Sequence, residues 1–437
     1  MSSPDLLRSD DIIVASHSGP LSGTVEVPGA KNSVLKLMAA TLLAEGRHVI
    51  TNAPVITDVE LMADLLAALG LTIALEHAGP GEIGQRIVID NRGTLEHVAP
   101  FHLADRIRAS VNVLGPLMGR LGRVDIALPG GDDFGGRPID MHLRALEAMG
   151  ATFRTEGASV HGRSGRLRGA DIMLDFPSVG ATENVLMAAV VAEGTTRIAN
   201  AAREPEIVDL CTMLGSMGAR ITGAGTSDIV VEGRDPGDLV AVEHSVVTDR
   251  VQAATYIAAT GMCGGTVRVE RAVADHMGMF LARLGDMGFV FDVDPRGITA
   301  TAPSRMRAVD VATLPYPGFA TDYKPLVVAL LSVAEGTGIV TENLYPGRFR
   351  YVDELRRLGA DISIDGHHAA VRGVSGLSGA PVTAPDIRAG AALVVAGIAA
   401  SGTTEISGVH HIDRGYDDLT GRLAALGAQV SRIPARR

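Results

Sequence analysis

Hydrophobic and polar positions follow a pattern that recurs six times along the chain. The first part of the pattern is an Ala-rich apolar stretch that ends in glycine before a β-branched strand, at Gly46, Gly122, Gly194, Gly265, Gly336 and Gly402. The second part is a helix that ends in a hydrophobic residue and glycine before another strand, at Gly70, Gly150, Gly218, Gly288, Gly359 and Gly427. Glycine at the position after a helix readily becomes left-handed, so each glycine predicts the end of a helix and the start of a strand.

The six copies are nearly equal in length, with glycines of the second set roughly 70 residues apart. Such repeats predict an α/β fold in which apolar helices are buried inside sheets. We expect two domains of three βαβαββ-type units each, with an active-site cleft between the domains. The first domain is placed at residues 31–246 and the second at residues 1–30 and 247–437, with the strand at 23–27 joining the later units.

Composition and charge limit the function classes. The 437-residue chain is 46% hydrophobic but only 3% aromatic, and its net charge of −11 argues against nucleic acid or an anionic membrane as the main partner. Its two cysteines, Cys211 and Cys263, lie in apolar runs and indicate buried free thiols in a reducing compartment. The acidic N-terminus lacks the apolar core of a signal peptide, and the run at 389–400 is too short to cross a bilayer. We therefore expect a cytoplasmic protein.

Motifs for the common cofactors are absent from the sequence. It contains no phosphate-binding loop of the GxxxxGKS or GxxxxGKT type and no Gly-rich dinucleotide fingerprint. Its histidine pairs, at 367–368 and 410–411, do not have the spacing of a zinc site. We expect neither a metal nor an organic cofactor, so basic side chains would have to hold any anionic ligand.

The Gly-rich stretch at 129–140 is the strongest candidate for chemistry. Its glycines allow positive φ and a change of shape at little steric cost. Among them the sequence places two adjacent acids, Asp132 and Asp133, and one arginine, Arg137. A loop with these groups can close over an anion, donate a proton and exclude water. A polar β-turn or hairpin is the alternative interpretation.

Two further charged positions precede expected helices. Lys31 and Asn32 precede an apolar helix at 34–44, where the helix N-terminus can bind an anion, although capping by Asn32 or Ser33 explains the same pattern. Asp322 precedes the helix at 326–334, and N-capping is the simpler interpretation of its spacing.

Arginines recur in similar settings in both halves of the chain. Arg108 opens a second apolar helix, and three others lie near turns of the later half, namely Arg348, Arg388 and Arg414. Each alone is typical of a protein surface. Their shared setting favours a cationic cleft assembled from distant segments.

At these positions the sequence resembles the enolpyruvyl transferase family. The resemblance covers residues 21–433 and includes Gly-Ala-Lys-Asn at 29–32, Arg-Ala-Ser at 108–110, the loop at 129–140, Ser-Val-Gly-Ala-Thr at 178–182, the segment 200–206, Thr-Asp at 321–322, Asp-Ile-Arg at 386–388 and the segment 411–416. It implies two inside-out α/β barrels of three repeats each, in agreement with the periodicity. The implied reaction moves the enolpyruvyl group of phosphoenolpyruvate to the 3-hydroxyl of UDP-N-acetylglucosamine and releases phosphate, without a cofactor, in the synthesis of peptidoglycan for the cell wall.

The resemblance also implies roles for individual residues. Lys31, Arg137 and Arg414 would hold the phosphate of the donor, and Arg348 and Arg388 would serve its carboxylate. Asp322 would accept the proton of the sugar hydroxyl as general base, and Asp132 would donate a proton to C3 of the enol. Substrate contacts are also implied for Asn32, Arg108, Arg137, Pro138, Ile139, Asp140, Met141, Ser178, Val179, Gly180 and Leu344.

The chain departs from the family pattern in the Gly-rich loop. Many relatives have Cys where this chain has Asp132, some have Asp, and the adjacent Asp133 is the alternative proton donor. An aspartic acid with an ordinary pKa near 3.9 is about 99.9% ionised at pH 7, so desolvation would have to raise its pKa.

Further departures concern the acceptor. Lys324 stands where Gln is common, and Tyr345 precedes Arg348 in an unusual segment. The alternatives are therefore the same transfer to another acceptor, either a uridine nucleotide such as UMP in nucleoside antibiotic synthesis or a shikimate-type acid, and a catalytically inactive binding scaffold.

Overall fold

The computed structural model describes residues 11–79, 83–130 and 138–434. The described residues form two compact units. The first unit contains residues 28–130 and 138–247, and the second contains residues 11–27 and 248–434. Asp132, Asp133 and Arg137, on which three sequence predictions depend, lie outside the described residues.

The strands of the first unit form three sheets, in the orders β13-β3-β5-β4, β6-β8-β7 and β11-β12-β10-β9. Their bounds are β3 (Gly46–Ala53), β4 (Thr72–His77), β5 (Gln85–Asn91), β6 (Arg123–Ala127), β7 (Thr152–Glu156), β8 (Ser159–Arg163), β9 (Asp171–Met173), β10 (Thr195–Ala199), β11 (Arg220–Thr222), β12 (Asp228–Glu232) and β13 (Glu243–Ser245). In the three-stranded sheet, an isolated parallel bridge between Val98 and Asp125 takes the place of the fourth strand.

Three four-stranded sheets belong to the second unit, in the orders β21-β22-β1-β23, β15-β16-β14-β2 and β17-β18-β20-β19. Their bounds are β1 (Ile12–Ser16), β2 (Leu21–Glu26), β14 (Gly265–Glu270), β15 (Val290–Asp294), β16 (Gly297–Thr301), β17 (Val311–Ala312), β18 (Thr337–Thr341), β19 (Asp361–Asp365), β20 (His368–Arg372), β21 (Pro381–Thr383), β22 (Thr403–Ser407) and β23 (Gln429–Ile433).

Every four-stranded sheet is built in the same way. A parallel edge strand lies beside the strand that follows the first glycine, and two antiparallel strands complete the sheet. In the last sheet the inner antiparallel strand is β1, which pairs Ile13 with Ile406 and Val14 with Ser431. The N-terminus therefore supplies the strand that the sixth repeat lacks. These six sheets confirm the predicted α/β fold of repeated units.

Helices of the first unit are α1 (Lys31–Ala40), α2 (Thr57–Ala68), α3 (Phe101–Ala104), α4 (Leu114–Leu121), α5 (Asp140–Ala148), α6 (Val179–Ala189) and α7 (Pro205–Ser216), with 3-10 turns η2 (Thr41–Leu43), η3 (Arg108–Val113) and η4 (Pro236–Asp238). Helices of the second unit are α8 (Arg250–Cys263), α9 (Gly278–Met287), α10 (Lys324–Leu331), α11 (Val352–Arg357), α12 (Ile387–Gly397), α13 (Val409–Asp413) and α14 (Leu419–Ala425), with η5 (Ala274–Met277) and η6 (Thr321–Tyr323).

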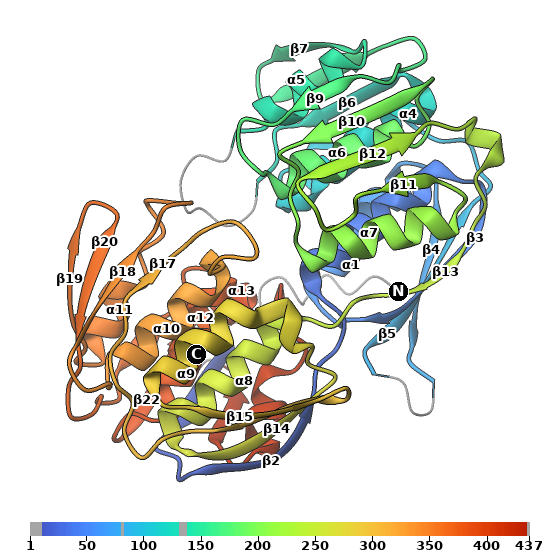
Figure 1. Cartoon of the computed structure of the whole chain (residues 1–437). Coiled ribbons are helices and arrows are strands. Elements are labelled where there is room, and N and C mark those ends of the chain that lie inside the picture. The colour runs from blue at the N-terminus through green and yellow to red at the C-terminus, as the bar shows by residue number, and fades with distance from the viewer. Residues whose placement is uncertain (1–10, 80–82, 131–137, 435–437) are drawn as a thin grey trace. The chain divides into compact units, whose positions relative to one another are not determined.

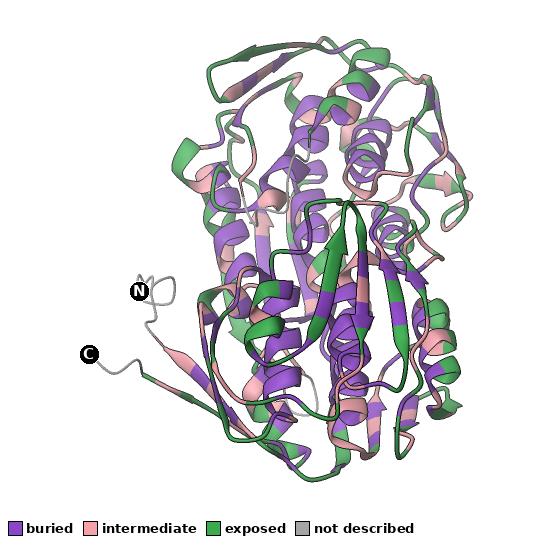
Figure 2. Cartoon of the chain, turned by 90° about the vertical axis from the view of Figure 1, so that its left-hand side faces the viewer, coloured by how far each residue is buried: buried purple, intermediate pink, exposed green. Residues whose placement is uncertain are grey.

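The core of each unit is made of apolar helices covered by sheets. In the second unit α8, α10 and α12 contact one another, and every residue of α10 and α12 is buried (Figure 1). Figure 2 shows the inner helices in purple, whereas the strands alternate between buried and exposed residues. A helix that is apolar on all sides is stable only when it is enclosed in this way. No helix among the described residues is long and apolar enough to span a membrane.

All twelve glycines of the repeat have positive φ, as the sequence predicts, between 62° at Gly122 and 128° at Gly46. Small residues also let the inner helices approach closely. A Cβ at Gly115 of α4 would lie 2.3 Å from the carbonyl oxygen of Asn184 on α6, so only glycine fits there.

Candidate active site

Asp322 is the centre of a charged cluster in the second unit. It lies in the 3-10 turn η6, and Arg348 Nη1 donates a 2.9 Å hydrogen bond to its Oδ1. Arg388 Nε lies 3.5 Å from its Oδ2. Both arginine side chains are buried, whereas that of Asp322 is 24% exposed. The carboxylate therefore has two fixed cations behind it and an edge open to solvent. We call these three residues the Asp322 cluster.

N-capping by Asp322 is not observed. The N-cap residue of α10 is Tyr323, and it makes no side-chain capping bond. The carboxylate instead binds arginines that lie 26 and 66 positions later in the chain. The simpler interpretation of its spacing is therefore wrong.

Arg388 is held at the start of α12 with unused hydrogen-bonding capacity. Asp386 caps this helix by accepting from the backbone N–H groups of Arg388 and Ala389. Burial works against the charge of Arg388, but Tyr416, Asp322 and other acidic groups raise its pKa, so it remains a cation. Its Nη1 is buried and has no hydrogen-bond partner among the described residues. A buried donor without a partner is costly, and an anionic ligand would satisfy it.

A buried ion pair lies beside the Asp322 cluster. Lys324 Nζ is 2.8 Å from Glu342 Oε2, and both side chains are fully buried. Glu342 also accepts a 2.7 Å hydrogen bond from Thr321 Oγ1, next to Asp322. Leu344, a predicted substrate residue, donates its backbone N–H to Glu342 Oε1 at 2.8 Å. Sequence reasoning noticed Lys324 only as an unusual residue, because the burial of its amine depends on a segment that begins eighteen positions later, at Glu342.

Arg414 also belongs to the second unit, at the C-terminal cap of α13. Its backbone N–H donates to His411 at 3.3 Å. Its contact with the donor phosphate stays a prediction.

In the first unit, Lys31 and Asn32 are the first residues of α1, which begins three positions before the predicted helix at 34–44. Lys31 Nζ forms a 3.1 Å ion pair with the buried Asp58. The N-cap residue is Ala30, without a side-chain capping bond, so the capping interpretation is wrong here too. Ser33 Oγ instead donates a 2.5 Å hydrogen bond to Asp209, far along the chain. The backbone N–H groups at this helix start remain suited to an anion.

The predicted acceptor residues of the first unit gather around α5 and α6. Ser178 caps α6 by accepting from Ala181 N at 3.3 Å, and Val179 and Gly180 form the first turn of that helix. Such a turn presents backbone N–H groups that suit a diphosphate. Met141 lies on α5, Ile139 is the N-cap residue of that helix, and Pro138 precedes it.

His142 connects several of these residues and was missed by sequence reasoning. Asn184 Nδ2 donates to its Nδ1 at 2.9 Å, and a Cβ at Gly180 would lie 2.9 Å from its ring. Burial, together with the nearby charge of Arg108, lowers the pKa of His142 to about 4. The ring is therefore neutral at pH 7, and glycine is the residue that fits against it.

Asp140 makes an ion pair on the exposed side of the same helix. Arg144 Nη2 lies 2.8 Å from Asp140 and 2.7 Å from Asp175. The structure thus brings Arg108 and Gly180 close to α5 in the first unit. In the second unit it groups four predicted site residues, namely Asp322, Arg348, Arg388 and Leu344. Among the described residues no group of three or more His, Cys, Asp or Glu side chains could hold a metal ion.

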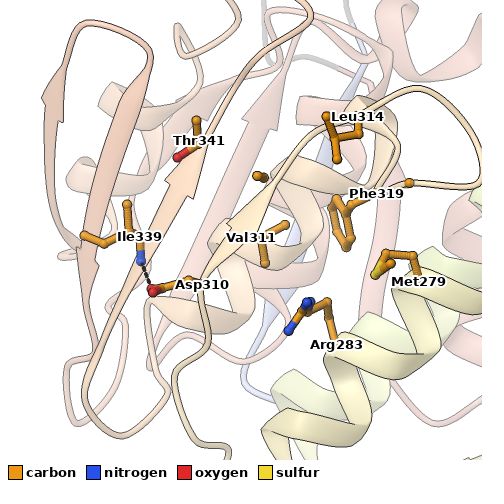
Figure 3. A pocket seen from close by; sticks show the side chains of 10 residues that line it. Met279, Arg283, Asp310, Val311, Leu314, Phe319, Ile339 and Thr341 are labelled. Carbon is orange, nitrogen blue, oxygen red and sulfur yellow. Dashed lines mark hydrogen bonds between the residues drawn. The ribbon is translucent and has the colours of Figure 1, made fainter.

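A separate pocket of about 420 Å³ lies in the second unit, between α9 and the sheet of β17 and β18 (Figure 3). Its lining is mostly apolar, with Met279, Leu314 and Phe319 on one side, and Asp310 accepts a hydrogen bond from Ile339 N at 2.8 Å. None of the predicted site residues lines this pocket.

Comparison with known proteins decides the family. The family model of EPSP synthase (3-phosphoshikimate 1-carboxyvinyltransferase) matches residues 15–423. The chain belongs to this family of enolpyruvyl transferases. It is 51% identical to the UDP-N-acetylglucosamine 1-carboxyvinyltransferase of Nocardia farcinica over 94% of this chain and 96% of the relative. It is 50% identical to the protein of that name from Mycobacterium tuberculosis (strain CDC 1551 / Oshkosh) over 96% and 98%.

Solved structures agree with the family's fold. The enolpyruvyl transferase NikO from Streptomyces tendae superposes with a TM-score of 0.87 at 26% identity, covering 98% of this chain and all of that one. EPSP synthase from Acinetobacter baumannii has a TM-score of 0.74 at 18% identity, covering 97% and 100%. The resemblance to the enolpyruvyl transferases and the predicted enzyme class are therefore confirmed.

Proposed function

We propose that this family member transfers the enolpyruvyl group of phosphoenolpyruvate to the 3-hydroxyl of UDP-N-acetylglucosamine, releases phosphate and so supplies a peptidoglycan precursor. The observation that carries the proposal is the near-complete alignment, at about half identity, with relatives that bear the name of this activity. The paired Asp322 cluster supports it, because it combines cations for an anionic donor with a carboxylate base. The two free cysteines support a reducing, cytoplasmic setting.

The donor is a trianion and requires several cations. In this proposal Arg348 and Arg388 bind its carboxylate, and Lys31, Arg137 and Arg414 bind its phosphate. Arg388 Nη1 has no partner among the described residues, so it can donate a hydrogen bond to the ligand without losing an existing one.

The chemistry needs one acid and one base. A proton is added to C3 of the enol as C2 gains positive character, and the sugar hydroxyl attacks C2 while Asp322 takes its proton. The tetrahedral intermediate then loses phosphate, and C3 returns its proton to the acid. Asp132 is the proposed acid, and the Gly-rich loop that contains it would exclude water.

The acceptor is proposed to bind the first unit. The N-terminal turn of α6, at Ser178, Val179 and Gly180, would bind the diphosphate through backbone N–H groups, with Arg108 as a nearby cation. The neutral His142 ring lies against Gly180 and would keep this turn in place.

The decisive experiment is a phosphate-release assay. The enzyme is incubated with phosphoenolpyruvate and, in separate reactions, UDP-N-acetylglucosamine, UMP or a phosphorylated shikimate-type acid. We expect release with the UDP-sugar, and equal or better release with another acceptor would contradict the proposal.

The variant Asp322→Asn should lower kcat by about 10²- to 10⁴-fold, because it keeps the shape of the side chain but cannot accept the proton. The matched control is Asp353→Asn, which also breaks an arginine pair, at 2.7 Å to Arg356, but on an exposed helix surface. The control should keep the activity of the unaltered enzyme. Full activity of Asp322→Asn would exclude the proposed base.

A further inference from the structure

Lys324 is an unusual residue because its charge is completely enclosed. It is the first residue of α10, and its side chain has no solvent exposure. Its Nζ binds Glu342 Oε2 and donates a 2.5 Å hydrogen bond to the backbone carbonyl of Arg348. The ring of Phe349 lies 4.0 Å from the amine. The lysine therefore joins the start of one helix to the segment at 342–349.

Glu342 organises the same segment from its other end. Its Oε1 accepts from Thr313 Oγ1 at 2.7 Å and from the backbone N–H groups of Leu344 and Tyr345 at 2.8 and 3.0 Å. Its Oε2 accepts from Thr321 Oγ1. Four donors and one lysine thus fix a single carboxylate, and the turn at 342–345 is built around it.

Thr321 and Arg348 connect this pair to the proposed base. Thr321 Oγ1 donates to Glu342 and accepts from Arg348 Nη1 at 3.1 Å. The same Nη1 donates to Asp322 Oδ1 at 2.9 Å. Lys324 holds the backbone of Arg348 while Thr321 holds its guanidinium. A shift of either end would move the cation that positions Asp322.

We propose that Lys324 is a positioning residue for the reaction: its ammonium group fixes the segment 342–348 through Glu342 and the Arg348 carbonyl, and so sets the contact between Arg348 and Asp322. The inference rests on the proposed function, because Asp322 is taken as the base. It goes beyond that function in making turnover depend on the protonation of a group that contacts no substrate.

The surroundings of the amine explain why its protonation matters. Burial is the largest influence and lowers the pKa of Lys324 to about 8, although Glu342 and Asp386 oppose this and the charge of Arg348 adds to it. The ring of Tyr351 lies 5.9 Å from the amine, and burial raises its pKa well above the ordinary value. Tyr345 and Arg350 are the further titratable side chains of this part of the chain. Lys324 is thus the group facing this network that changes charge near pH 8.

Loss of that proton would leave the Glu342 charge buried without its cation. Burial is the largest influence and opposes the ionisation of Glu342. The charge of Lys324 and the hydrogen bonds from Lys324, Thr313 and Thr321 together outweigh burial, so the pKa of Glu342 is lowered. A neutral amine binds Glu342 and the Arg348 carbonyl less strongly than an ammonium group does, so the segment at 342–348 would rearrange. We therefore expect kcat to fall above pH 8, by about tenfold per pH unit once the proton is lost.

Stability should change in the opposite direction. Between about pH 8 and the ordinary lysine value of 10.5, the unfolded chain carries a proton at Lys324 that the folded chain lacks. Stability rises with pH wherever the unfolded state binds more protons. The alkaline loss of turnover caused by Lys324 is therefore not a loss of folded protein, and a melting curve at each pH separates the two.

The test compares three variants in the full-length protein. Lys324→Gln keeps a donor for Glu342 and Arg348 but cannot titrate, so it should stay active near pH 7 and lose the decline above pH 8. Lys324→Met has no donor and should lower kcat by about 10²-fold. The KM for the UDP-sugar should change less than kcat does, because the residues proposed for its diphosphate, at the start of α6, lie in the first unit. Glu342→Gln removes the charge that favours the ammonium form, so the decline should begin at a lower pH.

A matched control comes from the first unit. Lys36 and Glu183 also form a buried ion pair, on α1 and α6. Lys36→Met should lower the melting temperature in the manner of Lys324→Met, yet leave the alkaline decline where the unaltered enzyme has it. This control separates the specific effect on Asp322 from the general cost of a broken buried pair.

Hydrogen exchange over residues 343–348 gives a readout that needs no substrate. At pH 7 exchange should be faster in Lys324→Met and unchanged in Lys324→Gln, because the amides of Leu344 and Tyr345 bind Glu342. An unchanged alkaline decline in Lys324→Gln, or unaltered exchange in Lys324→Met, would overturn the inference. Absence of phosphate release with every acceptor would instead reject the proposed function, while the exchange result still decides the role of Lys324.

Discussion

At the scale of the residue, the second unit holds its charges in pairs inside the protein. Arg348 and Arg388 share the carboxylate of Asp322, and Lys324 has Glu342. Each buried charge would cost several kcal/mol without its partner. Such groups do not need to reorganise when a charged substrate binds, which is the source of most electrostatic catalysis. The pairing therefore favours an anion-handling enzyme over an inactive scaffold.

The proposed proton donor, Asp132, stands where many relatives have Cys, and this difference can be tested. Asp132→Ala should lower phosphate release by about 10²- to 10⁴-fold, because no group then protonates C3. An epoxide phosphonate that alkylates a loop thiolate should leave the unaltered enzyme active, since Asp132 presents no thiol. Phosphate release and the mass of the intact protein after exposure to the epoxide measure both effects.

Asp133→Ala is the matched control for this experiment, because it removes the neighbouring carboxylate from the same loop. It should retain most of the turnover. Loss of activity in Asp133→Ala with retention in Asp132→Ala would assign the acid to Asp133, and rapid inactivation of the unaltered enzyme by the epoxide would contradict a carboxylate donor altogether.

At the scale of the element, the end of α11 shows how the repeat is fixed. Gly359 N donates to Arg356 O at 2.9 Å and Ala360 N donates to Leu355 O at 3.1 Å, the hydrogen bonds of a Schellman motif. The φ of Gly359 is 92°, and an added Cβ would meet no atom within 4 Å. The conformation of the backbone alone therefore requires glycine at this position.

Two glycine substitutions in the second unit should have opposite effects on stability. Gly359→Ala should cost about 1–2 kcal/mol, because an L-residue is strained in the left-handed region. Gly285→Ala should instead stabilise by about 0.5–1 kcal/mol, since Gly285 lies on an exposed face inside α9 with free space around it. Thermal unfolding should show a shift of about 2–4 °C per kcal/mol for a unit of this size. Equal shifts in the same direction would contradict the conformational explanation.

Local spacing predicted these elements but not the partners of their polar residues. The glycine pattern predicts the end of α11 because the motif involves only neighbouring residues. Ser33 and Asp322 have the spacing of capping residues, yet they bind Asp209 and two arginines that the fold brings from far along the chain. A hydrogen bond to a distant partner leaves no mark on local sequence, so the capping interpretations were wrong.

At the scale of the whole molecule, periodicity was enough to predict the fold class. Six nearly equal repeats can bury their apolar helices only by stacking, and the six sheets follow one plan. The pattern did not predict that β1 would complete the last sheet, because its partners lie some 390 and more residues later. The burial of His142 and Lys324 was also not predicted, since it depends on contacts with residues that are distant in the sequence, such as Asn184 and Glu342.

The two cysteines, one in each unit, offer a test of how the units unfold. Cys211 on α7 of the first unit is buried as predicted, whereas Cys263, at the end of α8 of the second unit, is only partly buried. Burial raises the pKa of each thiol to about 12, so at pH 8 the thiolate fraction, and with it the alkylation rate, should be about 10³-fold below that of a free cysteine. Peptide mass spectrometry after timed alkylation should find both cysteines unmodified in the native protein and both modified in urea.

Alkylation at intermediate urea concentrations then shows whether the two units unfold together or separately. Each core is enclosed within its own unit, and such units can unfold independently, so Cys211 and Cys263 should become modified with different midpoints. Rapid modification of either in native protein would contradict its burial. Because both natural thiols are protected, Asp132→Cys would add the only fast-reacting thiol in the chain, and selective alkylation there would show that the loop position is accessible in the folded enzyme.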